Sequence, residues 1–247
     1  VGPDGAVWFV GQTGDYVARL DPKTGEFKRY ELDPGTGPHN LVVDAKGQIW
    51  YAGNRAAHIG RLDPATGKIT KYPMPDPAAR DPHTLIFDRQ GDLWFTMQGA
   101  NFVGKLAVQT GEVKLVPVPT RNARPYGIGI DSRGRVWVNL FGTNKLAQID
   151  PATLALREIG LPRAEARTRR LVITSDDRVW YVATPAASSG ATTPRRVRSR
   201  SGRCRAVRRA GRTEWRWTTG TGSGRSRRAR GRTGSSASTR RRSSSSA

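Results

Sequence analysis

The sequence has few of the features that would fix its compartment. Residues 1–186 contain no cysteine, and the single cysteine of the 247-residue chain is Cys204. A cysteine-free domain fits an oxidising compartment as well as the cytosol, so cysteine usage excludes neither. No stretch approaches the roughly 18 apolar residues of a membrane-spanning helix, so we expect no membrane partner. The chain begins inside a repeat, at Val1 instead of Met, which makes the lack of a signal peptide uninformative.

Long helical patterns are also missing, and a repeat takes their place. The segment Pro162–Arg170 could form one helical turn and is interpreted as a loop. The stretch DAKGQIW, at 44–50, recurs as GPDGAVW, DRQGDLW, DSRGRVW and SDDRVW. The tryptophans that end these copies are 42, 44, 43 and 43 residues apart, at Trp8, Trp50, Trp94, Trp137 and Trp180. A fixed period in this range is typical of repeat architectures.

Each repeat reads as four short strands joined by turns. In the second repeat, apolar runs at 39–44 and 48–53 flank a turn with Gly47, and a third strand leads into the turn DPATG at 63–67. Four strands and one tryptophan in about 43 residues predict an all-β β-propeller, with four blades and part of a fifth in residues 1–182. We expect the tryptophans to pack between neighbouring sheets. The repeated Asp44, Asp88 and Asp131 are expected to hold turns and not a metal.

Residues 183–247 differ sharply in composition. From residue 187 onward there are 18 arginines, no lysine and one acidic residue, Glu214. The preceding part has 24 basic and 19 acidic residues, so the chain's net charge of +22 comes mainly from this tail. A segment rich in Arg, Ser and Gly with few apolar residues is predicted to be disordered. Such a segment can also bind nucleic acid without specificity.

A shift of the reading frame explains the tail better than a nucleic-acid-binding role. Synonymous codons for Ser189–Val197, read from the third base, give GRYDPATG, which matches GRLDPATG at Gly60–Gly67. Glu214–Gly224 likewise gives MAVDDRDRVW, another copy of the tryptophan turn. One base restored near codons 182–184 places the new DPATG 13 codons after Trp180, the interval between Trp50 and Asp63. On this interpretation the tail carries no selected function, and no specific nucleic acid is bound.

The repeat pattern resembles the virginiamycin B lyase (streptogramin lyase) family of β-propellers. Pro38-His39, Pro82-His83 and Pro125-Tyr126 match the family's Pro-His or Pro-Tyr step at the start of each inner strand. The segments WYAGNRAAHIGRL and WFTMQGANFVGKL match its second and third strands. The resemblance covers residues 1 to about 182. It implies a seven-bladed propeller when complete. The compartment is not fixed by the sequence, and a periplasmic or secreted location is favoured.

The resemblance also implies a reaction, the opening of a cyclic depsipeptide by elimination at an ester. That chemistry needs a base near an acidic C–H and a cation for the developing enolate, supplied in the family by histidine and by Mg²⁺ held partly by glutamate. His39 and His83 are the candidate catalytic residues. The expected glutamates are not found, because Gly11, Gly53, Met97 and Asn139 stand at or next to their place. No residue of this chain is therefore assigned to a metal.

Further candidates lie where loops reach the mouth of the channel, a position that commonly binds ligands. They are Asn54, Gln98, Arg124, Tyr126 and Asn139. Arg169 and Arg170 replace the Pro-His step in the fifth repeat and would favour an anionic ligand if they face the channel. His58 is expected on a strand surface. We expect a monomer that binds a small molecule at this mouth.

Three alternatives to the lyase remain open. A noncatalytic propeller would bind a ligand or a protein at the same mouth. A lactonase of similar shape would need acidic residues in the channel. A nucleic-acid-binding protein would depend on the tail alone.

Overall fold

The structure is a computed structural model that describes residues 1–184, 188–193, 196–209 and 212–219. Its described residues form strands and turns with no helix, grouped into five antiparallel sheets. None of the described residues forms a helix long and apolar enough to cross a membrane. The predicted all-β propeller of four-stranded units is confirmed.

The first four sheets correspond to the first four repeats. The first has three strands and the next three have four strands each, in chain order across the sheet. Their bounds are β1 (Val7–Gly11), β2 (Tyr16–Leu20), β3 (Phe27–Glu31), β4 (Pro38–Val43), β5 (Ile49–Gly53), β6 (His58–Leu62), β7 (Ile69–Pro73), β8 (Pro82–Phe87), β9 (Leu93–Met97), β10 (Phe102–Leu106), β11 (Val113–Pro117), β12 (Pro125–Ile130), β13 (Val136–Leu140), β14 (Lys145–Ile149) and β15 (Leu156–Gly160).

The fifth sheet has five strands and differs from expectation at two places. Its strands are β16 (Arg167–Ile173), β17 (Val179–Thr184), β18 (Ser188–Thr193), β19 (Arg196–Arg209) and β20 (Arg212–Thr219). The start of β16 lies inside Pro162–Arg170, so the prediction of a loop there is wrong for its last four residues. Three of those residues, Arg167, Thr168 and Arg170, pair with the end of β17, as the inner strand of every earlier four-stranded sheet pairs with its neighbour.

Strands β18 to β20 lie in the segment that was predicted to be disordered. β18 pairs with the open edge of β17, and β19 and β20 continue the same sheet. A sheet edge presents free N–H and C=O groups that an extended segment can pair with whatever its side chains. The fifth sheet therefore continues beyond the expected boundary at residue 182. Residues 220–247 lie outside the described part of the chain.

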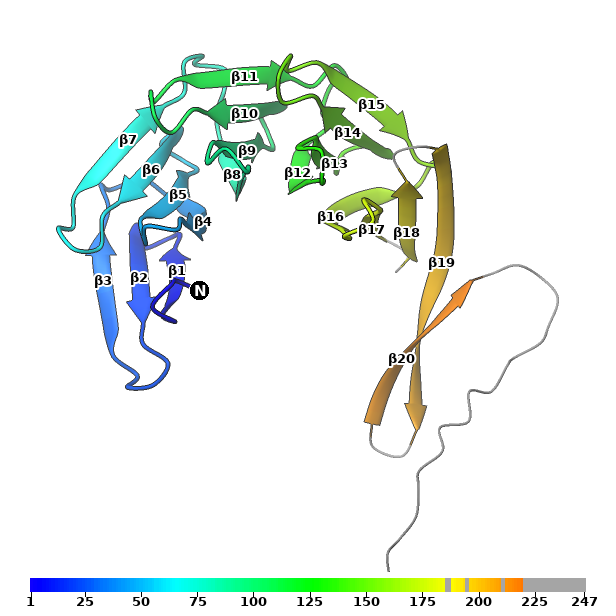
Figure 1. Cartoon of the computed structure of the whole chain (residues 1–247), viewed down its shortest axis with the longest axis horizontal. Coiled ribbons are helices and arrows are strands. Elements are labelled where there is room, and N and C mark those ends of the chain that lie inside the picture. Colours follow the sequence, from blue (N-terminus) through cyan, green and yellow to red (C-terminus); the bar gives the residue numbers. More distant parts are fainter. Residues whose placement is uncertain (185–187, 194–195, 210–211, 220–247) are drawn as a thin grey trace, which may run out of the picture.

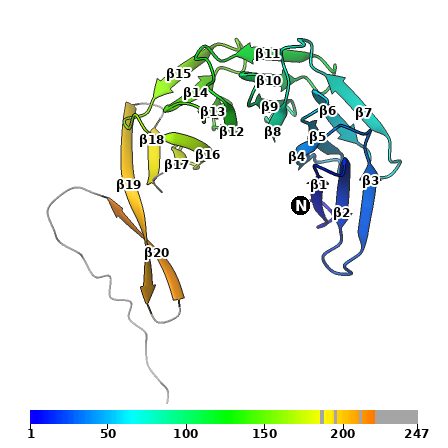
Figure 2. The ribbon, with the colours of Figure 1, turned by 180° about the vertical axis from the view of Figure 1, so that it is seen from behind.

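The sheets are arranged as an open arc around a common centre (Figure 1). β4, β8, β12 and β16 line the concave side, and β7, β11 and β15 form the convex rim, as the reverse view also shows (Figure 2). Successive inner strands lie next to one another, from β4 to β8, β8 to β12 and β12 to β16. Residues at the same position in these strands are therefore brought together although they are about 43 residues apart in sequence.

The turn that recurs before the tryptophans has the same geometry in three repeats. In the second, Asp44 Oδ1 accepts hydrogen bonds from the N–H groups of Lys46 and Gln48, both at 2.9 Å, and Oδ2 accepts one from Trp50 Nε1 at 3.0 Å. Gly47 has a φ of 77°, which a residue with a side chain rarely adopts. Asp88 and Asp131 make the same contacts. The prediction that these carboxylates hold turns is confirmed.

The tryptophans join each sheet to the next. Trp50 packs among Leu93, Phe95 and Met97 of the third sheet, and Trp94 packs among residues of the fourth. Trp8 and Trp137 contact the second and fifth sheets in the same way. The expectation that they form the core between sheets is confirmed. The core thus sits between the sheets, and the inner ends of the blades are free to form a site.

Candidate functional site

The inner strands share an irregularity at the point where each begins. Residues 39–40 of β4 stand opposite one residue of β5, so the strand contains a β-bulge. Similar register shifts follow Pro82 in β8, Pro125 in β12 and Thr168 in β16. A bulge locally redirects side chains and is frequent near functional sites. The residues at these four bulges are the ones that the sequence singled out, namely His39, His83, Tyr126 and Arg169.

The residue before each proline prepares the bulge. Gly37, Asp81 and Arg124 have φ values of 53°, 56° and 54°. Positive φ is uncommon for residues with a side chain and costs free energy, so it persists only where the surroundings hold it. In Arg124 the backbone N–H donates to Asn101 Oδ1 at 3.3 Å, and the carbonyl accepts from Phe141 N at 3.1 Å. The positive φ before each of these prolines is a feature of the site that the sequence analysis did not predict.

The bulged residues and their neighbours form what we call the inner-strand cluster. Its members are His39, His83, Tyr126, Phe141, Arg169 and Arg170. The rings of His39 and His83 lie 3.8 Å apart between centroids, and those of His83 and Tyr126 lie 4.3 Å apart. Phe141 extends the row, with its ring 5.9 Å from Tyr126. Four successive sheets therefore contribute to one row of side chains on the concave side.

Arg169 and Arg170 close the cluster on the side of the fifth sheet. Arg169 Nη2 donates a 2.8 Å hydrogen bond to the Tyr126 hydroxyl, and its guanidinium lies 4.6 Å from the centre of that ring. The guanidinium of Arg170 lies 5.2 Å from the same ring. Both arginines thus face the cluster. The sequence had left open whether they do.

The two histidines are held in the neutral form. Burial lowers the pKa of His39, and the charges of Arg170 and Arg169 lower it further. Burial also lowers the pKa of His83, to about 3, with smaller contributions from His39 and the two arginines. His83 is almost fully buried, whereas His39 is half-buried. Of the two rings, His39 is the one a ligand could reach with less rearrangement.

Hydrogen bonds behind the cluster act within one strand and between two sheets. His83 Nδ1 lies 2.9 Å from Thr84 Oγ1, and Thr96 Oγ1 donates to the Tyr126 carbonyl at 2.9 Å. Asn139 follows Trp137 by two residues, as Thr96 follows Trp94, so Leu140 holds the place where the resemblance implies glutamate. The buried amide of Asn139 has no hydrogen-bond partner among the described residues. It lies beside Gly127, where an added Cβ would be 2.6 Å from Asn139 Oδ1 and 2.7 Å from the Arg169 carbonyl.

Three other residues were predicted to bind a ligand, namely Asn54, Gln98 and Arg124. No side-chain contact found among the described residues joins them to the inner-strand cluster. Asn54 Nδ2 donates to the Pro82 carbonyl at 3.0 Å, so this side chain positions the start of β8 beside His83. Gln98 lies in the turn after β9, and Arg124 is exposed before β12. Their role as ligand contacts stays a prediction.

The prediction for the position of His58 is wrong. It was expected on a strand surface, but it is buried, 4% exposed, and its ring packs edge-on at 5.8 Å from Tyr51. The reason is that β6 lies inside the sheet, and Gly53 opposite leaves room for the imidazole. Burial lowers its pKa as well.

The donor atoms of the cluster do not fit Mg²⁺. This ion prefers carboxylate oxygens in an octahedral arrangement. Among the residues that the structure describes, no group of three or more His, Cys, Asp or Glu side chains could hold a metal. Magnesium binding therefore stays a prediction from the resemblance, and none of the described residues is assigned to it.

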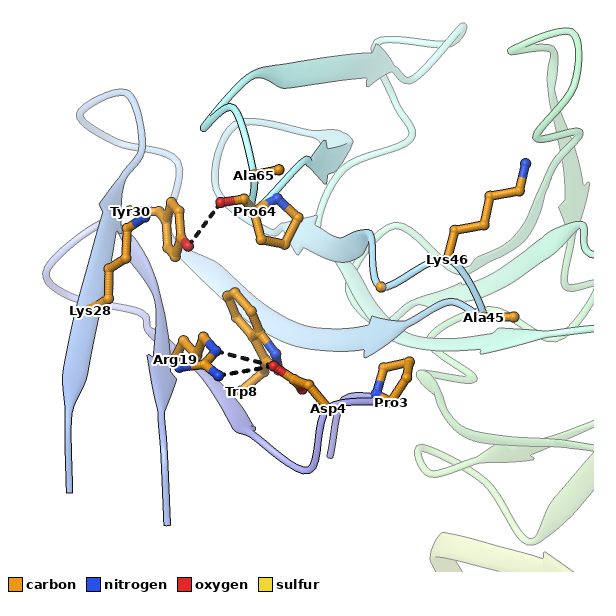
Figure 3. A pocket seen from close by; sticks show the side chains of 11 residues that line it. Pro3, Asp4, Trp8, Arg19, Lys28, Tyr30, Ala45, Lys46, Pro64 and Ala65 are labelled. Carbon is orange, nitrogen blue, oxygen red and sulfur yellow. Dashed lines mark hydrogen bonds and ion pairs between the residues drawn. The ribbon is translucent and has the colours of Figure 1, made fainter. Parts of the chain in front are cut away.

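Two clefts lie elsewhere, between sheets. One of about 500 Å³ lies between the first and second sheets and is lined by Trp8, Arg19, Tyr30, Lys46 and Pro64, among others (Figure 3). A second, of about 790 Å³, lies between the second and third sheets beside Trp50, Arg61 and Phe87. Both involve the turn after β4, at the opposite end of this strand from His39. In the first, Tyr30 donates to the Pro64 carbonyl and Arg19 pairs with Asp4.

Low pH is expected to destabilise the fold through His83. An unfolded chain binds a proton at this residue near pH 6.5 whereas the folded chain does so only near pH 3, so stability is lost as pH falls through this window. Between pH 7 and pH 5 the loss from His83 is up to about 2 kcal/mol. Urea unfolding at pH 7, 6 and 5 should show a shallower pH dependence in His83→Gln than in the wild type. Equal slopes for the two proteins would contradict the assignment.

The arc of four-stranded sheets around a central site defines the class of β-propellers built from sequence repeats. The family model for the virginiamycin B lyase family matches residues 1–199, beyond the expected limit of about 182. The chain belongs to the virginiamycin B lyase family. A search of curated proteins found no match.

Solved structures agree on the fold. Virginiamycin B lyase from Staphylococcus aureus superposes with a TM-score of 0.74 at 22% identity, over 82% of this chain and 68% of that one. A catalytically inactive histidine-to-alanine variant of the same enzyme with quinupristin gives 0.73 at 24% identity, over 81% and 67%. A streptogramin B lyase gives 0.73 at 26% identity, over 88% and 74%.

Proposed function

We propose that the protein is a carbon–oxygen lyase that opens a cyclic ester of the depsipeptide class by elimination, with His39 as the base. The observation that carries this proposal is the pair of neutral histidines at the bulges of adjacent inner strands, with ring centroids 3.8 Å apart. Two further observations support it. The chain belongs to the virginiamycin B lyase family, and a histidine variant of one related enzyme is catalytically inactive.

The reaction moves one proton and breaks one bond. A neutral imidazole takes the proton from a carbon next to a carbonyl, the electron pair forms a C=C bond, and the C–O bond of the ester breaks. The ester oxygen leaves as part of a carboxylate, so no water is consumed. His39 suits the base because it is neutral at pH 7 and half-buried. His83 supports it by packing against its ring.

The developing negative charge needs a positive partner. In the described blades this partner is Arg169 or Arg170, because both guanidinium groups lie beside the histidines and lower their pKa values. Fixed charges aimed at the place where charge develops can supply much of the rate enhancement of an enzyme. The mechanism proposed for these residues contains no step through a metal.

The test is turnover of a cyclic depsipeptide such as quinupristin, followed by mass spectrometry. Elimination gives an opened product of unchanged mass, whereas hydrolysis gives a product heavier by one water. His39→Gln is expected to lower kcat by about 10²- to 10⁴-fold, the range for loss of a general base. His83→Gln should lower it less, and His58→Gln should leave kcat per folded molecule unchanged.

Two results would overturn the proposal. One is a product heavier by water, and the other is an equal loss of kcat in all three histidine variants. Because His58 and His83 are both buried, the folded fraction of each variant is measured by near-UV circular dichroism at the assay temperature. Turnover that is lost on adding a chelator would show that a metal takes part, held by residues outside the inner-strand cluster.

A noncatalytic ligand-binding propeller is the second candidate. It is favoured because Gly53, Met97 and Leu140 provide no carboxylate at the positions where the resemblance implies glutamate. It predicts that the same depsipeptide binds without turnover and that His39→Gln weakens binding. Calorimetry with the intact ring compound separates the two candidates.

A further inference from the structure

The two arginines of the fifth sheet bring their charges to the concave side without an acidic partner, whereas several basic residues elsewhere in the described blades are paired. Arg135 pairs with Asp131 at 2.7 Å, Lys145 with Glu158 at 2.7 Å and Lys105 with Asp92 at 3.0 Å. No ion pair among the described residues includes Arg169 or Arg170. Two adjacent guanidinium groups therefore bring uncompensated positive charge to the concave side.

The guanidinium of Arg169 is held in place by aromatic rings. It lies 4.6 Å from the centre of Tyr126 and 5.6 Å from that of Phe141, and Nη2 donates to the Tyr126 hydroxyl. Tyr126 itself is 4% exposed and fixed by the sheet. The hydrogen bond to Tyr126 uses one N–H of the guanidinium and leaves its other N–H donors available to a planar anion. Such an orientation reduces the entropy cost of binding.

The bulge in β16 explains why an arginine reaches this place. Thr168 pairs with Ala183 and Arg170 with Val182, so Arg169 is the extra residue of the bulge. It thereby occupies the position of His39, His83 and Tyr126 in the preceding sheets. The fifth sheet presents a cation where its neighbours present rings.

We propose that Arg169 and Arg170 form a carboxylate-binding subsite that holds the leaving group of the ester as the C–O bond breaks. The role of this subsite in the reaction rests on the proposed function. Its binding of the acid does not depend on that function. The electron pair of the broken bond ends on the leaving oxygen, and the carboxylate so formed accepts N–H bonds from Arg169 with Arg170 beside it. The proton removed from carbon stays on His39 until solvent takes it.

The test compares two ligands that differ only in charge. The ring-opened acid of the depsipeptide and its primary amide are titrated by calorimetry into the full chain at pH 7 and low salt. The acid is expected to bind at least 10-fold more tightly than the amide in the wild type. Arg169→Gln should remove this preference, and Arg170→Gln should reduce it. Arg133→Gln, the same change of charge on an exposed turn at the other end of the fourth blade, should preserve it.

Arg169→Lys separates charge from geometry. It keeps the positive charge but loses the stacked, forked group, so the preference should fall to an intermediate value. In turnover, Arg169→Gln is expected to lower kcat with little change in KM, because the carboxylate charge develops only as the bond breaks. Inorganic phosphate, added as a competitor, should displace the acid but not the amide.

The failures of the two proposals can be told apart. Equal binding of acid and amide by the wild type overturns the subsite, even if the ring compound is turned over. An acid preference that depends on Arg169, without turnover, upholds the subsite and overturns the lyase. An acid preference that survives in both Arg169→Gln and Arg170→Gln also overturns the subsite.

Discussion

One base inserted near codons 182–184 is expected to raise the thermal midpoint of the protein by about 10 °C or more. The two ends of the arc expose apolar side chains, with exposed fractions between 36% and 61%; they are Val7, Phe9 and Phe27 at one end and Val172 and Val182 at the other. Repeats restored after residue 182 would pack against the fifth sheet and cover Val172 and Val182. Fully burying one such side chain contributes about 1.5–3 kcal/mol, and 1 kcal/mol shifts the midpoint by about 2–4 °C at this size.

The matched control is an insertion of three bases at the same codons, which adds a residue but keeps the frame. It should not raise the midpoint, because a residue added inside β17 only disturbs its pairing, and silent changes nearby should leave the midpoint unchanged. Calorimetry on the three purified proteins measures the effect. A repaired chain no more stable than the control would contradict the frameshift, and so would a change that the three-base insertion reproduces. Genomic DNA across codons 180–247 provides an independent check.

Repeat spacing was enough to predict the fold because each blade meets the same physical demands. The tryptophan must pack on the next sheet and the aspartate must satisfy the turn before it, so both recur about every 43 residues. The last four residues of Pro162–Arg170 were misassigned because this segment lacks the proline that marks the start of the other inner strands. The sequence of β18 to β20 was not recognised as strands, and their pairing begins at the edge of β17.

The site was predictable in part. His39, His83 and Tyr126 share the Pro-His or Pro-Tyr step, and the structure brings their rings into one row. The bulges that aim these rings could not be read from residue types, because they depend on pairing between strands. Gln98 and Arg124 were predicted to contact a ligand only because they lie in loops, and this basis did not predict where their side chains lie. A turn residue's direction depends on backbone dihedrals that its side chain does not determine.

His58 shows why strand position alone misled the sequence analysis. It was expected on a strand surface, yet β6 is a middle strand of its sheet and four of its five residues are buried. The deciding feature is Gly53 across the strand pair, which leaves space for the ring. The same pairing of glycine and aromatic ring recurs at Gly60 with Tyr51 and at Gly104 with Phe95, and this pattern could have been found in the sequence.

Trp94→Ala is expected to lower the free energy of unfolding by about 3–5 kcal/mol, the usual cost of removing a buried large aromatic side chain. Trp94 is fully buried between the third and fourth sheets, where it contacts Val138 and Ile149. The change would also leave Asp88 Oδ2 without its 2.9 Å hydrogen bond from the indole. Urea unfolding followed by circular dichroism measures the loss.

The position of Trp94 within a repeat array makes a second effect expected. Blades contact only their neighbours, so stability is close to a sum of terms from each blade and each interface. Weakening the interface between the third and fourth sheets should therefore split one transition into two, seen as different midpoints for tyrosine fluorescence and far-ultraviolet circular dichroism. Trp180→Ala is the matched control, because this residue holds the same place in the fifth repeat but is only half-buried. It should cost less than half as much and leave the transitions coincident, and an equal cost at both positions would contradict the role of the tryptophans in joining the sheets.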